Sequence, residues 1–87
     1  MDEVAKVMST ATNYAVVQLP GRNYPGVVVQ GDSLHALLIQ VEGIRKLAAK
    51  HTDSELAAEV ANLHDVLLDA TTHFEMVCRR AGVGLPY

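Results

Sequence analysis

Apolar residues in the last third of the chain recur at alternating intervals of four and three residues. They are Leu56, Val60, Leu63, Leu67, Ala70, Phe74, Val77 and Ala81. This spacing is typical of the a/d seam of a helix that packs lengthwise against another helix. The sequence therefore predicts a long helix over residues 54–81, and that helix needs a second one as its partner.

A second apolar stripe between residues 33 and 51 supplies the partner helix. Its members are Leu34, Leu37, Leu38, Val41, Ile44 and Ala48. Thr52 and Glu55 have the spacing of a capping box, which separates the two helices. Gly43 weakens the middle of the first helix, so we expect a close contact there. The sequence thus predicts an antiparallel helical hairpin, followed by a tail at residues 82–87.

The N-terminal third has a different pattern. Apolar residues at helical spacing behind two acids predict a short helix over residues 3–10. Two valine-rich segments, residues 14–19 and 26–30, flank a stretch with two Pro-Gly dipeptides, which predicts a β-hairpin. A two-stranded hairpin is only marginally stable in water, so we expect it to pack against the helices.

These elements make one α+β domain of 87 residues: a short N-terminal helix, a two-stranded hairpin and a long helical hairpin packed against it. The second helix would extend about 40 Å and the first only about 28 Å, at about 1.5 Å per residue. We expect the β-hairpin to cover the overhang, with a homodimer as the alternative.

Composition limits the partners. No apolar run approaches the roughly 20 residues that cross a bilayer, and the N-terminus lacks a secretory signal, so we expect a cytoplasmic protein with no membrane role. The net charge of −3 and the scattered basic residues argue against nucleic acid binding. The lone Cys78 excludes an internal disulfide and a cysteine zinc site, and its position beside the seam predicts burial.

The tetrapeptide Gly31-Asp32-Ser33-Leu34 resembles the GDSL esterases, whose nucleophilic serine follows a strand and opens a helix. Catalysis by Ser33 would need a histidine, a group that orients it and an oxyanion hole. Asp69 and His73 lie four residues apart on one predicted helix, whereas that family places its pair two residues apart outside a long helix. We therefore interpret Asp32 or Ser33 as a helix N-cap and expect no catalytic residues; a small serine hydrolase is the alternative.

Histidines raise the question of a metal site. They are His35, His51, His64 and His73. Asp65, Asp69 and His73 share one face of the predicted second helix, but positions two turns apart do not converge on one ion. We expect no metal and no cofactor, and we interpret Asp65 and Asp69 as a solvated acidic surface that is available to a partner.

A loop tip is the other candidate binding surface. Arg22, Asn23 and Tyr24 lie between the two Pro-Gly dipeptides, and arginine and tyrosine are enriched at the energetic centres of protein interfaces. We therefore take these three residues as a candidate partner-binding site.

A wider resemblance covers residues 16–34. Val-Val-Gln-Leu-Pro-Gly-Arg at 16–22 and Pro-Gly-Val-Val-Val-Gln-Gly-Asp-Ser-Leu at 25–34 look like the core of a small bacterial family of unknown function with a single domain. The resemblance implies a bacterial source and no activity. With no catalytic set, we expect a cytoplasmic protein-protein interaction module, such as an inhibitor or immunity protein that occupies a co-encoded toxin or defence enzyme. The alternatives are the serine hydrolase and a purely structural homodimer.

Overall fold

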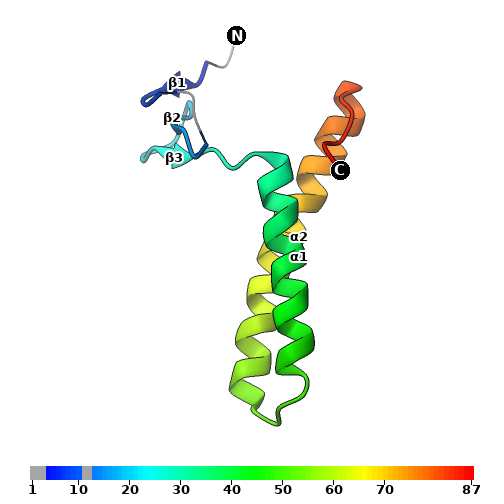
Figure 1. Ribbon diagram of the computed structural model, residues 1–87. Coiled ribbons are helices and arrows are strands. Elements are labelled where there is room, and N and C mark those ends of the chain that lie inside the picture. Colours follow the sequence, from blue (N-terminus) through cyan, green and yellow to red (C-terminus); the bar gives the residue numbers. More distant parts are fainter. Residues whose placement is uncertain (1–3, 11–12) are drawn as a thin grey trace. The chain divides into compact units, whose positions relative to one another are not determined.

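The computed structural model describes residues 4–10 and 13–87 (Figure 1). These residues form three strands and two helices: β1 (Lys6–Val7), β2 (Val16–Gln18), β3 (Gly26–Val27), α1 (Gly31–Ala48) and α2 (Ser54–Ala81). The chain divides into two compact units, Met1–Gln30 and Gly31–Tyr87. The first unit holds the sheet and the second holds the helices, so the protein is of the predicted α+β class.

The sheet is antiparallel, and β2 is its central strand. Lys6 pairs with Gln18 at one edge of β2, and Val16 pairs with Val27 at the other. The helix predicted at 3–10 is therefore wrong where the chain is described, because residues 6–7 form a strand; residue 3 lies outside the described residues. Local spacing suggested a helix, but hydrogen bonding to a strand ten residues further along the chain decides the structure.

The predicted hairpin is the β2–β3 pair, with shorter strands than expected. β2 begins only at residue 16 because Tyr14 has φ 62°, a left-handed conformation that no strand residue adopts. Beyond the end of β3, Val28 N–H still donates to the Ala15 carbonyl at 2.8 Å. The two-stranded prediction was incomplete, since β1 adds a third strand.

α2 has a capping interaction at each end, whereas α1 starts earlier than predicted. α1 begins at Gly31, so Asp32 and Ser33 lie in its first turn and the predicted N-cap at either residue is wrong. The Asp32 carboxylate accepts the Ser33 N–H at 2.8 Å inside this turn. The N-cap of α2 is Asp53, which accepts the Leu56 N–H at 3.0 Å, so the predicted capping box at Thr52 is wrong. Gly82 ends α2 in the left-handed conformation at φ 70°, as a helix C-terminus favours.

The core of this unit is a single seam between the antiparallel helices. α1 contributes Leu38, Val41 and Ala48, and α2 contributes Val60, His64 and Thr71. Leu34 of α1 and Leu67, Phe74 and Cys78 of α2 are half-buried in the same rows. The α2 seam is therefore 60, 64, 67, 71, 74 and 78, and not the predicted row through Leu63, Ala70 and Val77. Cys78, which we expected to be buried beside the seam, is half-buried and lies in the seam itself.

The close glycine contact occurs at a different position from the one predicted. A Cβ added to Gly43 would meet only open space, so the expected contact there is wrong. A Cβ added to Gly31 would collide with the ring of Phe74. The start of α1 therefore approaches α2 closely, and the absence of a side chain at Gly31 makes room for the aromatic ring.

The C-terminal tail returns along the helices after Gly82. The Tyr87 ring stacks on His35 of α1 with centroids 3.7 Å apart, and its hydroxyl donates to Glu75 of α2 at 3.0 Å. Neighbouring protein atoms and the Glu75 carboxylate raise the pKa of Tyr87. The tail thus covers part of the C-terminal end of α2, which extends beyond the region paired with α1. Neither helix of the described residues is long and apolar enough to cross a membrane.

Candidate interaction surfaces

The loop between β2 and β3 is shaped by a tight turn. Arg22 N–H donates to the Leu19 carbonyl at 3.3 Å, and Gly21 has φ 75°. Proline followed by a glycine with positive φ is the signature of a type II turn. The Gln18 side chain braces the same backbone, because its amide donates to the Arg22 carbonyl at 2.7 Å. The conformation of the loop tip is therefore fixed by the residues that immediately precede it.

The loop tip presents the three residues that the sequence singled out. Arg22, Asn23 and Tyr24 are all exposed, and 82% of Tyr24 is open to solvent. With Gly21 they line a shallow hollow of about 350 Å³. The site offers guanidinium donors, a side-chain amide and an aromatic face, which are groups suited to binding.

The predicted acidic residues lie on α2, in the other unit. Asp65 and Asp69 are exposed and one helical turn apart. Asp65 Oδ1 lies 3.8 Å from Nδ1 of His64, so part of its charge faces the seam. Among the described residues, Asp69 has no ion pair. The acidic surface and the loop tip thus belong to different units of the chain.

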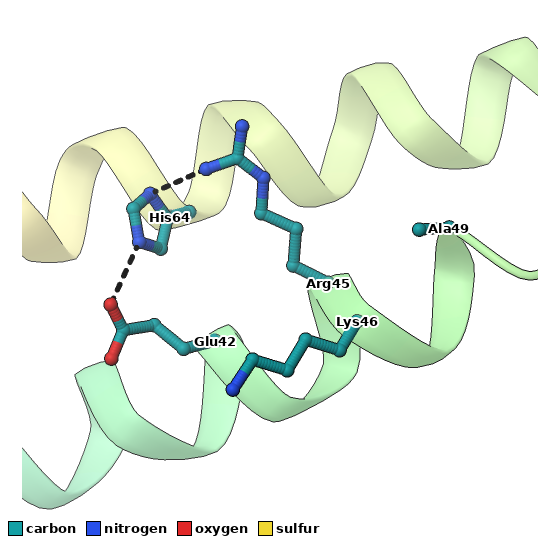
Figure 2. Close-up of a pocket in the computed structure, with 5 residues that line it drawn as sticks. All are labelled: Glu42, Arg45, Lys46, Ala49 and His64. Atoms are coloured by element: carbon teal, nitrogen blue, oxygen red, sulfur yellow. Dashed lines mark hydrogen bonds and ion pairs between the residues drawn. The ribbon is translucent and has the colours of Figure 1, made fainter.

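A pocket of about 370 Å³ opens beside the seam, between the two helices, and charged or polar residues form most of its lining (Figure 2). Its wall consists of Glu42, Arg45, Lys46, Ala49 and His64. An Arg45 guanidinium nitrogen lies 3.4 Å from His64 Nδ1, and Glu42 Oε2 lies 3.5 Å from His64 Nε2. Because arginine only donates, the Arg45 contact is a hydrogen bond in the tautomer whose Nδ1 accepts, and in that tautomer the proton is on Nε2, the nitrogen nearer Glu42. Burying His64 in the seam is tolerated because both ring nitrogens have partners.

The backbone N–H of Ser33 donates to the Asp32 carboxylate at 2.8 Å. In the described part of the chain, no hydrogen bond joins Ser33 to a histidine. His35 stacks on Tyr87 and His64 lies in the seam, while His51 and His73 are exposed. No three His, Cys, Asp or Glu side chains within the described ranges converge on a metal position.

One side of the helical hairpin is apolar and open. On each helix, this side carries the residues that come immediately before a seam residue in the sequence. In an antiparallel pair, these residues of both helices lie on the same side of the hairpin. We call this surface the apolar face. Its large members are Leu37, Ile44 and Leu47 of α1 and Leu56, Leu63, Val66 and Val77 of α2, and all of them are exposed.

The opposite side of the hairpin carries the residues that follow seam positions. Here lie Glu42, Lys46, Asp65 and Glu75, together with the pocket and the docked tail. Two exposed apolar residues, Ile39 and Leu68, also lie on this side. We call it the polar side. The two flanks of one seam therefore differ sharply in charge.

The chain matches the Family of unknown function (DUF6959) over residues 1–87. The chain belongs to this family. Membership confirms the predicted resemblance to a single-domain family of unknown function, and it assigns no activity to any residue. No curated protein and no solved structure matches the chain.

Sequence reasoning missed the apolar face as a surface. It placed Leu37, Ile44, Leu63 and Val77 in the seam, because each helix carries two adjacent apolar rows and the more apolar row looked like the core. A pair of polar residues distinguishes the two rows. Arg45 of α1 lies opposite His64 of α2, so the row that contains each of these residues faces the other helix.

Proposed function

We propose that the chain is a protein-binding module that acts by covering part of a partner protein's surface. The observation that carries the proposal is the loop tip, where Tyr24 is 82% exposed on a backbone braced by a type II turn and by Gln18. A binding residue held in place before the encounter loses little conformational entropy on association. A large aromatic side chain kept in water has no role in the core.

The chemistry of the tip supports this use. Arg22 offers donors for a partner's carboxylates or carbonyls, and Tyr24 offers a rigid aromatic surface with a polar end. The hollow of about 350 Å³ beside them leaves room for a side chain of the partner. Tyrosine and arginine dominate the binding energy of many interfaces.

The proposal has a narrower form. A small module with net charge −3 and an exposed acidic pair at Asp65 and Asp69 suits a partner with a basic cleft, such as a co-encoded toxin or defence enzyme that it inhibits. Three net charges give modest steering, so the inhibitor interpretation stays a prediction about the partner's class.

The experiment measures affinity for the protein encoded by the neighbouring gene. Replacing Arg22 and Tyr24 together with alanine should raise the Kd at least about 100-fold, because two hot-spot residues are lost. Replacing Asp65 and Asp69 should slow association more than it speeds dissociation. The control replaces Lys50, an exposed residue outside both sites. Unchanged affinity in both test variants would show that the surface assignment is wrong.

The hydrolase alternative is tested separately. Turnover of an activated ester that disappears in Ser33→Ala, with the helical signal intact, would overturn the binding proposal in favour of an enzyme. No contact of Ser33 in the described chain favours that outcome.

A further inference from the structure

Two helices alone form one contact surface, which does not bury all the apolar residues of the helical hairpin. Among the described residues, the buried hydrophobic side chains are Leu38, Val41, Ala48 and Val60, and no large side chain is fully buried. Each helix nevertheless has a second apolar row beside the seam, on the apolar face. A helix with two adjacent apolar rows is typical of a bundle in which every helix contacts two neighbours.

We propose that a second copy of the chain covers the apolar face, so that two helical hairpins form a four-helix bundle. This inference is independent of the loop-tip proposal, which uses residues of the other unit. It names one occupant for the face, and three observations favour that occupant over others.

The first observation is area. The seven large side chains of the apolar face leave on the order of 600 Å² of apolar surface on each chain, so complete coverage of two such faces would bury on the order of 1,200 Å², the lower end of the range of specific interfaces. A patch of this size is at the upper end of what monomers leave open, and such patches often mark a binding surface.

The second observation is length. α1 has 18 residues and spans about 27 Å, and the apolar face extends along it from Leu37 to Leu47 near the turn. The strands of the sheet have two or three residues, about 7–10 Å each, so no single strand matches the face in length. A second helical hairpin has the same length as the face.

The third observation is charge. From Leu37 to Leu47 of α1 and from Leu56 to Val77 of α2, Glu59 is the one Asp, Glu, Lys or Arg that immediately precedes a seam residue, whereas the polar side carries several charges of both signs. A twofold axis sets a surface against itself, so each charge placed there needs an opposite charge as its partner, and a nearly uncharged face has no such requirement.

The spacing along α2 is also self-complementary. Leu63 and Ala70 lie nearly equidistant from Val66, and Glu59 and His73 lie seven residues on either side of it. If α2 crosses its copy in antiparallel fashion at Val66, Glu59 meets His73 of the second copy. The one charged residue of the face thereby gains a hydrogen-bonding partner.

The experiment is light scattering of the full chain at several concentrations, with a matched pair of variants. The wild-type mass should be twice that of one 9.4 kDa chain. Leu63→Glu places a charge on the apolar face and should raise the dimer dissociation constant at least about 100-fold. Leu68→Glu changes the same residue type on the same helix, on the polar side, and should leave the dimer intact. The two leucines are similarly exposed, at 52% and 41%.

Circular dichroism follows the helical signal of both variants. If Leu63→Glu loses its helices as well as its dimer, Leu63→Ala and the second pair, Ile44→Glu against Ile39→Glu, repeat the comparison with the same expected order. A wild-type monomer at every concentration would overturn the inference. So would dissociation by the polar-side variants, dimers in both apolar-face variants, or a mass above two chains.

Discussion

The two sides of the helical hairpin flank the same seam, but they differ in what covers them. On the polar side, the chain covers part of its own surface: the tail docks Tyr87 on His35 and Glu75, and charged residues surround the pocket. On the apolar face, seven large side chains remain exposed with no segment of the described helical unit over them. The difference teaches that a polar flank is stable in water by itself, whereas an apolar flank of this size indicates a missing partner.

The seam should be the most sensitive part of this arrangement. Leu38 is 7% exposed, and Leu38→Ala should lower the free energy of unfolding by about 2–3 kcal/mol, because it removes buried contacts and leaves a cavity. Ile39→Ala, one position further on the polar side, should lower it by less than about 1 kcal/mol. Urea unfolding at one fixed protein concentration measures both. Equal effects would show that burial does not separate the seam from its flank.

The two α1 glycines should respond in opposite directions. Gly31→Ala pushes a methyl group into the Phe74 ring and should destabilise the fold by about 1–3 kcal/mol. Gly43→Ala adds a methyl group in open space and should stabilise it by about 1 kcal/mol, because alanine favours helix.

A double-mutant cycle checks the cause of the Gly31 effect. In a Phe74→Leu background the cost of Gly31→Ala should fall, since the ring that it meets is gone. The same cost in both backgrounds would contradict the close approach of α1 and α2 at this point.

The turn between the helices gives a smaller effect. Asp53→Ala should lower the free energy of unfolding by about 1 kcal/mol, since it removes the acceptor for the Leu56 N–H. Thr52→Ala should change it by less than about 0.5 kcal/mol. Thermal unfolding of the two variants distinguishes them, and the reverse order would restore the capping box that the sequence predicted.

The tail contact predicts a dependence on alkaline pH. The pKa of Tyr87 is raised by its surroundings and by Glu75, so the folded state favours the protonated phenol. The contact therefore contributes fully below the ordinary tyrosine pKa of about 10 and is lost as the pH rises through the higher folded value. Ultraviolet titration should show a late tyrosine step that Tyr87→Phe removes. If the late step persists in that variant, Tyr87 is not its source.

Local sequence patterns predicted the helices and turns better than they predicted which helix surfaces are buried. The two-helix hairpin, the glycine that ends α2 and the turn before Arg22 follow from short patterns of apolar, glycine and proline residues, which act within a few residues of themselves. β1 was missed because its structure depends on pairing with β2, and no local spacing records that contact.

The position of the seam failed for a different reason. His64, Thr71 and Cys78 are less apolar than Leu63, Ala70 and Val77, so hydrophobicity favoured the wrong row. Thr71 is tolerated in the seam because its hydroxyl donates to the Leu67 carbonyl at 2.8 Å, and His64 because Arg45 and Glu42 approach it. Among the predicted site residues, Arg22, Asn23 and Tyr24 share one hollow at the loop tip, while Asp65 and Asp69 belong to α2 in the other unit.

The most direct test of the central claim is the thermal midpoint of the wild-type chain as a function of its concentration. When folding and pairing are coupled, association stabilises the folded state by mass action, so the midpoint should rise steadily over a hundredfold increase in concentration. A midpoint that stays constant over that range, in a chain that unfolds reversibly, would contradict the claim that a second copy completes the helical core.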